Sequence, residues 1–360
     1  MRLPVFVTTS VTLAILVLAP GWGIARDPDI LAQREGWHHG FRPWPRAVGM
    51  GGATVATARG AGGVYVNPAA LPGPAMFDMQ AGAFGGPDGY LEADEILHWG
   101  LVIGAEHLQF QFSTLAEIHG YDDPPEDVRD HDAPERAVYK FGVGFDLLRS
   151  DHGPWRLRSG VSAVVNSMIN QSEYVREDLD FDVGLTLAHE PTRQSGWQLG
   201  WQSAVAWTSL KDCFRGTRDH DLSDLTLAAA LELALHDPDP DPVAMSNGRP
   251  VFRQAHDRRR RVMDMVLAVE RTEYLNSGYA AEHRVGCEVG LGGVAFLRVG
   301  WRDASRSFEQ GWSQGLGLEV AVAKAHRVRL DWGRTGTVDN RLVSGDGNVV
   351  SIRWHAGLVR

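Results

Sequence analysis

The chain has 360 residues, 22% of them charged, with a formal net charge of -10 and a mean hydropathy of -0.20. This acidic balance argues against a nucleic-acid partner, because nucleic-acid-binding proteins carry basic surfaces. The low mean hydropathy excludes a bundle of membrane-spanning helices. The length suits either two soluble domains or one large all-β unit.

Residues 1–25 are predicted to be a secretory signal peptide. Arg2 supplies a basic start, and an apolar run occupies residues 5–19. Gly23 and Ala25 then give the small-x-small end of such peptides. The alternative is an uncleaved membrane anchor, for which the run is short. In both cases we expect the rest of the chain to leave the cytoplasm.

Residues 26–74 form a glycine-rich segment without the alternation of a strand. Its glycines allow tight turns and close packing against another surface. Asn67-Pro68 is a typical start of a turn. A flexible linker is the alternative, but linkers rarely carry apolar residues such as Val48, Met50 and Tyr65 among their glycines. We therefore predict a compact element packed inside a barrel.

From residue 75 to residue 360 the chain repeats segments of apolar and polar alternation, separated by breaks rich in Gly, Asp, Pro and Ser. In one segment Leu179 and Phe181 share a face, and Asp180 and Asp182 share the other. Segments of about ten residues suit a tilted membrane crossing, whereas soluble strands average nearer five or six. We predict about fourteen strands, at 76–84, 96–104, 106–113, 137–148, 155–166, 179–189, 196–207, 224–235, 262–270, 279–290, 293–302, 314–324, 326–333 and 348–359.

The connections between these segments alternate in length. Those after the even-numbered segments are mostly short, and those after the odd-numbered ones are mostly longer and polar. Short periplasmic turns and long outer loops are typical of outer-membrane barrels. Residues 236–261 break the rule, with Asp-Pro repeats and the basic run Arg258–Arg261. Parity places this excursion on the periplasmic side.

Tryptophans and charges occupy opposite faces of the predicted strands. Trp197 and Trp207 share a face and would lie roughly 23 Å apart along the membrane normal. That spacing matches an apolar band flanked by aromatic girdles. A secreted, soluble β-sandwich or propeller is the alternative. The charged residues that we expect to point into a hydrated lumen are Glu232, Asp264, Glu282, Arg284, Glu288, Glu319, Arg329 and Asp331.

The glycine-rich segment resembles the N-terminal signature of FadL-type outer-membrane proteins. The resemblance covers residues 49–53 (Gly-Met-Gly-Gly-Ala), 55–56 and 67–71 (Asn-Pro-Ala-Ala-Leu). This group includes long-chain fatty-acid and hydrocarbon transporters, and the PorV/PorQ proteins associated with type IX secretion. The resemblance implies a 14-stranded barrel in the bacterial outer membrane with the N-terminal segment inside it as a hatch. The residues assigned to the hatch are Gly49, Gly51, Gly52, Asn67, Pro68 and Ala69.

The sequence offers no signature of catalysis, and we predict a protein that is not an enzyme and has no cofactor. No Cys/His spacing suggests a metal site. Clustered carboxylates in residues 120–134 suit calcium, with a solvated outer loop as the alternative. Cys213 lies in a polar loop and Cys287 in an alternating strand, so we expect two unpaired thiols.

Two functions follow from these patterns. The first is passive transport of hydrophobic small molecules such as long-chain fatty acids. The second is an adaptor in the outer membrane that binds secreted proteins or a secretion machine. Both place the chain in contact with outer-membrane lipid. The residues expected to meet a transported ligand first, all assigned to outer loops, are Met168, Ile169, Tyr174, Phe214, Phe308 and Trp312.

Overall fold

The computed structural model describes the strands of a barrel and one segment within it. The described residues are 42, 44–70, 77–85, 94–104, 107–119, 135–149, 154–170, 173–189, 196–210, 223–236, 245–246, 249–250, 261–275, 281–303, 311–323, 326–335, 338–339, 344–345 and 347–356. The predicted signal peptide and the loop 120–134 lie outside these ranges.

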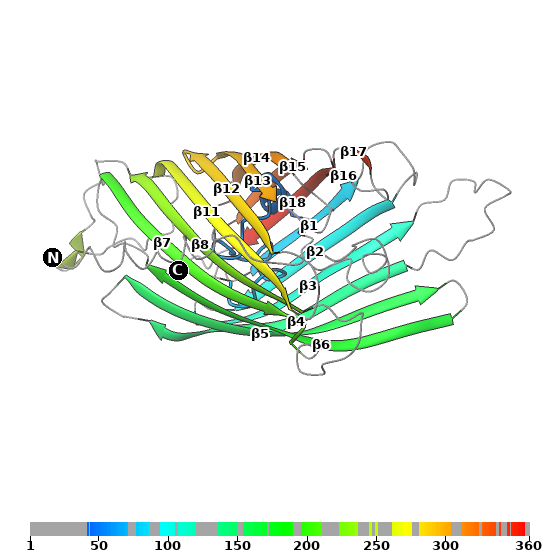
Figure 1. Cartoon of the computed structure of the whole chain (residues 1–360). Helices are drawn as coiled ribbons and strands as arrows, with labels where there is room; N and C mark the ends of the chain where they lie inside the picture. The colour runs from blue at the N-terminus through cyan, green and yellow to red at the C-terminus, as the bar shows by residue number, and fades with distance from the viewer. Residues whose placement is uncertain are drawn as a thin grey trace.

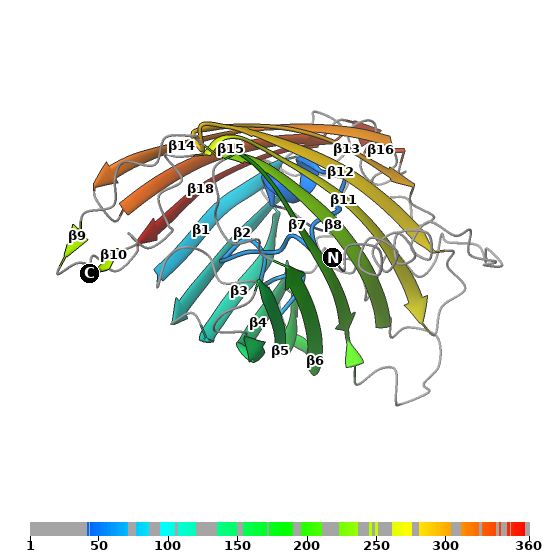
Figure 2. The same cartoon turned by 90° about the vertical axis from the view of Figure 1, so that its left-hand side faces the viewer.

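Fourteen antiparallel strands close into a barrel, in which β18 pairs with β1 (Figures 1 and 2). The predicted all-β fold is confirmed. The strands are β1 (Phe77–Gly85), β2 (Asp94–Gly104), β3 (Leu108–His119), β4 (Glu135–Arg149), β5 (Trp155–Asn170), β6 (Glu173–His189), β7 (Gly196–Thr208), β8 (Ser223–His236), β11 (Arg261–Leu275), β12 (Glu282–Leu291), β13 (Ala295–Asp303), β14 (Gly311–Ala323), β15 (His326–Thr335) and β18 (Asn348–Ala356).

Each of the fourteen predicted segments corresponds to one barrel strand. The largest errors are at the start of β6, which begins at Glu173 instead of 179, and at the end of β3, which reaches His119 instead of 113; β5 likewise reaches Asn170 instead of 166. Residues 171–178 carry polar side chains at both even and odd positions, so the period-2 signal fades there. Backbone pairing between β5 and β6 nevertheless continues, because it does not depend on which side chains the strands carry.

The outward face of the barrel is an apolar band. Phe141, Leu199, Leu267, Leu318 and Ile352, from strands around the whole circumference, are each about half exposed. Their polar neighbours along the same strands point inward and are buried. Apolar side chains outside and charges inside describe a transmembrane barrel, since a soluble sandwich would bury the apolar set.

One end of the barrel, here called the turn end, carries the short connections. They are residues 105–107, 150–154, 190–195, 292–294 and 324–325. The opposite end is called the loop end. The excursion between β8 and β11 starts from the turn end and contains a small hairpin of β9 (Met245–Ser246) and β10 (Arg249–Pro250). A second small hairpin, β16 (Val338–Asp339) with β17 (Ser344–Gly345), lies at the loop end.

Strands β6 and β7 are staggered. They pair only between residues 183–189 of β6 and 201–207 of β7. Among the described residues, 173–182 of β6 therefore pair with β5 alone. The chain leaves β7 at Ser209, whose φ of 55° is the only positive one among the described non-glycine residues. A left-handed residue turns the chain sharply, and the amide of Ser209 donates to Asp182 of β6 at 3.1 Å.

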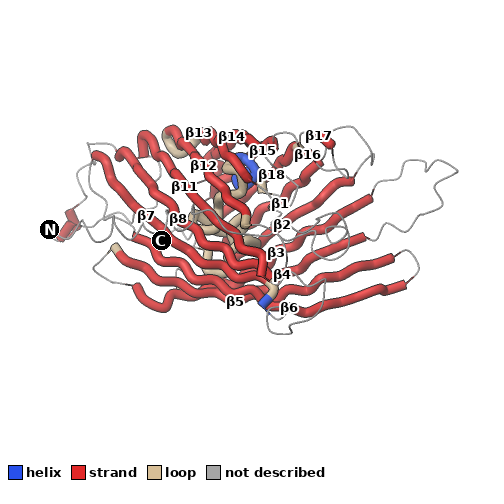
Figure 3. Tube along the Cα trace, in the orientation of Figure 1, coloured by secondary structure: helices blue, strands red, loops and turns tan. Residues whose placement is uncertain are grey.

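Residues 44–70, here called the inner segment, lie within the barrel (Figure 3). They contain the short helix α2 (Pro45–Gly49), which begins with a proline at its first position. Proline suits this position, because the first N–H groups of a helix have no intrahelical partner. No helix in the described part of the chain is long and apolar enough to cross a membrane.

The orientation of the barrel wall gives a first prediction. Leu267→Arg places a guanidinium in the middle of the outward face and should lower the free energy of unfolding by about 2–4 kcal/mol. Leu275→Arg, on the same face at the end of β11, should lower it by less than about 1 kcal/mol. Urea unfolding in lipid vesicles, followed by Trp fluorescence, measures both. Equal losses would contradict the assignment of this face to lipid.

Candidate functional site: the inner segment and its clamp

The inner segment forms the centre of the hydrophobic core. Trp44, Met50, Val55 and Val64 are at most 2% exposed. They belong to one cluster with inward residues of the wall, including Leu115. Because apolar side chains of both the inner segment and the barrel wall are buried in this cluster, the segment is part of the core and not a flexible linker.

Glycines bring the backbone of the inner segment against the wall. Gly51 and Gly52 have φ values of 61° and 83°, a conformation that glycine adopts without a steric penalty. A Cβ on Gly51 would lie 2.5 Å from the backbone nitrogen of Trp301. On the wall, a Cβ on Gly300 would overlap Gly51, and one on Gly160 would overlap Pro68. Missing side chains on both surfaces therefore allow backbone-to-backbone contact.

Asn67 folds the second part of the inner segment. Its Oδ1 accepts a hydrogen bond from the backbone of Ala69 at 2.9 Å, which closes the turn around Pro68. Its Nδ2 donates to the carbonyl of Val55 at 3.1 Å and to Oγ1 of Thr186 on β6 at 3.0 Å. Asn67 is fully buried. The predicted turn is therefore present, and it also attaches the segment to the wall.

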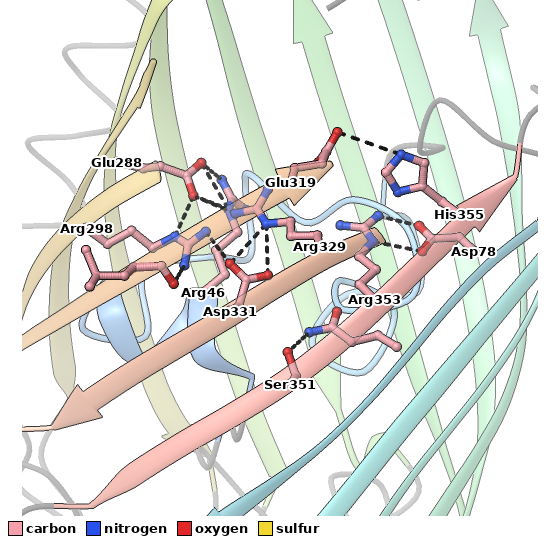
Figure 4. A network of polar contacts seen from close by, with 12 residues as sticks. Arg46, Asp78, Glu288, Arg298, Glu319, Arg329, Asp331, Ser351, Arg353 and His355 are labelled. Carbon is pink, nitrogen blue, oxygen red and sulfur yellow. Dashed lines mark hydrogen bonds and ion pairs between the residues drawn. The ribbon is translucent and has the colours of Figure 1, made fainter. Parts of the chain in front are cut away.

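Ion pairs hold the first part of the segment (Figure 4). Arg46 Nε lies 3.1 Å from Oε2 of Glu288 on β12. Glu288 also accepts from Arg298 Nε at 2.7 Å, and Arg298 Nη2 lies 2.7 Å from Asp331. Arg329 Nε donates to Asp331 at 2.8 Å. In this network each buried charged group lies next to a group of opposite charge, which offsets the cost of removing the charges from water.

A second cluster lies around Glu270 on β11. Arg42 forms an ion pair with Glu270, and Arg284 Nη1 lies 2.7 Å from the same carboxylate. The backbone amides of Thr54 and Val55 each donate to Glu270 Oε2 at 3.1 Å. One carboxylate thus fixes three points of the chain near the inner segment. Burial lowers the pKa of Arg42, and the field of Glu270 acts in the opposite direction.

The wall also binds the later part of the segment through backbone atoms. Asp78 accepts from the Ala61 amide at 3.2 Å and pairs with Arg353. Lys140 Nζ donates to the Tyr65 carbonyl at 3.0 Å. Two further wall side chains donate to carbonyls of the segment, Gln111 to Pro68 at 2.9 Å and Arg158 to Ala70 at 3.0 Å.

Charge complementarity explains why the clamp forms. Residues 42–70 contain three arginines and no acidic residue. Arg59 lies 3.6 Å from Glu232, so all three arginines meet a wall carboxylate. We name these three pairs, Arg42–Glu270, Arg46–Glu288 and Arg59–Glu232, the arginine clamp.

One expectation about the lumen is wrong. The charged residues predicted to face a hydrated interior do point inward, but Glu282 and Arg284 are inaccessible, and Glu288, Arg329 and Asp331 are at most 5% exposed. They are packed against the inner segment and against each other. Sequence alternation reports which face is polar, but not whether water or protein covers that face.

The predicted hatch residues are all buried in the inner segment, whereas the side chains of most of the predicted ligand contacts lie outside the described part of the chain. Gly49 is buried against Gly315, and Ala69 is fully buried.

Met168 and Tyr174 belong to strands β5 and β6 and not to a loop, with side chains outside the described part. Trp312 lies on the outward face of β14, 67% exposed and paired with Trp301, in the position of an interfacial girdle. Phe214 and Phe308 lie outside the described residues, as does Cys213, while Cys287 is a free thiol on β12.

Sequence reasoning missed the arginine clamp. Arg42 and Arg46 are single basic residues in a glycine-rich stretch, and no local pattern distinguishes them. The usable signal was the absence of acidic residues from 42–70 beside a wall rich in inward carboxylates. Among the described residues, no group of three or more His, Cys, Asp or Glu side chains could hold a metal ion.

Comparisons with known proteins find similarity in structure and none in sequence. No family model and no curated protein matches the chain. The toluene transporter TbuX of Ralstonia pickettii is 10% identical, with a TM-score of 0.47 over 87% of this chain and 98% of its own. The toluene transporter TodX of Pseudomonas putida is 11% identical, with a TM-score of 0.48 over 88% and 98%.

A FadL homologue of Pseudomonas aeruginosa is 11% identical, with a TM-score of 0.45 over 87% of this chain and 97% of its own. The FadL type, which the N-terminal motif resembles, is thus found among the structurally similar proteins.

The glycine contacts predict that an alanine destabilises the protein only where the wall touches the inner segment. Gly300→Ala should lower the free energy of unfolding by about 1–3 kcal/mol, because its Cβ would overlap the backbone of Gly51. Gly85→Ala is the matched control, since nothing lies within 4 Å of its Cβ position. Urea unfolding in vesicles compares the two. Equal midpoints for both variants would show that the inner segment does not press on the wall.

The Arg46–Glu288 ion pair predicts that loss of the carboxylate destabilises the protein more than loss of the guanidinium. Glu288→Gln should destabilise the protein by about 3 kcal/mol, because Arg298 and Arg329 would then share Asp331 as their one described buried counter-charge. Arg46→Gln should cost about 1 kcal/mol, because Arg46 is 25% exposed and Glu288 keeps Arg298. The same unfolding assay measures both. A larger loss for Arg46→Gln than for Glu288→Gln would contradict this account.

Proposed function

We propose that this protein is an outer-membrane barrel that transports hydrophobic small molecules, such as long-chain fatty acids, by passive diffusion. The observation that carries the proposal is the interrupted pairing of β6 with β7. Residues 173–182 of β6 pair on one side only in the described structure. At this level Leu179 and Phe181 project outward and are 50% and 41% exposed.

The inner segment makes a sideways route preferable to an axial one. It occupies the centre of the barrel and is held by the arginine clamp and by backbone contacts. A hydrophobic molecule that enters from the loop end would leave through the wall where, among the described residues, 173–182 of β6 pair with β5 alone. Its destination would be the apolar interior of the membrane, which favours such molecules over water.

The alternative is an adaptor of the PorV/PorQ kind, which binds exported proteins or secretion components. The close packing of the inner segment favours it, because a filled barrel can serve as a docking platform. Transport requires a route past this packing, and docking does not.

Whole-cell uptake tests the proposal. Expression in a bacterial host that lacks its own hydrophobic-compound barrels should raise the uptake of a radiolabelled long-chain fatty acid or alkane several-fold over an empty vector. Purification from native membranes provides the complementary measurement. Uptake no higher than that of the empty vector, together with co-purified secretion components, would reject transport and favour the adaptor.

A further inference from the structure

Charged side chains gather on one part of the outward face, at the loop end of β11, β12 and β13. Arg271, His283 and Asp303 are in register across these three strands. The residues next to them along each strand are inward and buried, so all three belong to the outward set. Glu273 follows Arg271 on the same face and forms an ion pair with it. We call Arg271, Glu273, His283 and Asp303 the charged rim.

The charged rim lies beside lipid-facing residues. On the neighbouring strand β8, Leu227 is in register with Arg271 and Leu225 with Glu273, and both leucines are outward and partly exposed. One outward position closer to the turn end, each of the three strands carries an apolar residue, namely Val269, Val285 and Trp301. Charge on this face costs several kcal/mol at mid-membrane but little at the interface. The charged rim therefore marks the level at which lipid headgroups begin.

Two tryptophans and a second arginine extend this surface around the wall. Trp301 and Trp312 are in register on β13 and β14, and Trp312 is 67% exposed. Tryptophan concentrates where hydrocarbon meets headgroups. Arg334 is exposed on the same face near the loop end of β15. Strands β11 and β15 are four positions apart in the barrel, and at about 4.8 Å a position they are separated by roughly 19 Å.

One nitrogen of the charged rim points to a ligand. Nε2 of His283 is shielded from solvent and has no hydrogen-bond partner among the described residues. A shielded polar atom without a partner is costly, so a bound molecule that supplies a partner would stabilise the site. The residue as a whole is partly exposed, and a change of rotamer can bring this nitrogen to the surface. An imidazole nitrogen donates to a phosphate or accepts from a hydroxyl group.

We propose that the charged rim, together with Arg334, binds the diphosphorylated sugar headgroup of a glycolipid in the outer leaflet of the membrane. The inference rests on the outer-membrane placement in the proposed function, with the longer loops outside. It does not depend on transport.

The charges of the surface match such a headgroup. Arg271 and Arg334 would each meet one phosphate, because a guanidinium matches a phosphate in charge and in geometry. Glu273 holds the guanidinium of Arg271 in place. The exposed carboxylate of Asp303 would accept hydrogen bonds from the sugar hydroxyl groups. Two arginines on strands this far apart suit a headgroup with two phosphates, whereas a phospholipid with one phosphate would reach only one of them.

Native mass spectrometry of the folded protein with added lipid tests the proposal. The probes are diphosphoryl lipid A, monophosphoryl lipid A and phosphatidylglycerol. The wild type should bind diphosphoryl lipid A about tenfold more tightly than either of the others, because each of those can form only one guanidinium–phosphate contact. Added salt should reduce this preference, because it screens charges at an exposed surface.

Single variants identify the residues involved. Arg271→Gln and Arg334→Gln should each weaken the binding of diphosphoryl lipid A about tenfold and leave that of the monophosphoryl form nearly unchanged, since the latter can use the remaining arginine. His283→Gln should weaken the diphosphoryl form about threefold. His326→Gln, an outward and partly exposed histidine at the turn end of β15, is the matched control and should change nothing. Heat-modifiable migration on gels shows that each variant has folded.

The outcomes separate this site from the proposed transport. Equal binding of the three lipids by the wild type, or an unchanged preference in both arginine variants, would overturn the proposal. Loss of the preference in both arginine variants, with none in His326→Gln, supports it. If the wild type binds diphosphoryl lipid A but takes up no fatty acid or alkane in the uptake assay, transport is rejected and the glycolipid site stands.

Discussion

The exclusion of charge from lipid is the constraint on which this structure depends. A guanidinium or carboxylate in the middle of the outward face is costly, so the described strands carry most of these groups on their inward face. The barrel must then neutralise many buried charges within a small interior. The arginine clamp and the alternating network around Glu288 and Asp331 are the consequence of this requirement.

The inner segment helps to neutralise the buried charges of the wall, but it also occupies the interior of the barrel. Its arginines pair with Glu288 and Glu232, the preceding Arg42 pairs with Glu270, and its own backbone donors bind Glu270 and Asp78. The same segment fills the centre of the barrel. A hydrophobic molecule is then best served by an opening in the wall, and the β6–β7 stagger is the place where the described ladder is interrupted.

The two faces of β6 at that interruption differ in chemistry. Asp180 and Asp182 occupy inward positions that alternate with Leu179 and Phe181 on the lipid face. Because a strand places neighbouring residues on opposite faces, one short stretch presents apolar groups to the membrane and carboxylates to the interior.

Alternation and turn residues in the sequence determined the all-β fold, the fourteen strands and their facing, because period 2 is a local property that each strand carries by itself. The glycines and Asn67 likewise predicted a compact N-terminal element. Only the tertiary structure decided that Arg46 meets Glu288, 242 positions away in the chain, and that Glu282, Arg284 and Glu288 are buried within the barrel. It also decided where β7 leaves β6. Register and long-range ion pairs depend on how the barrel closes, and no local pattern encodes that closure.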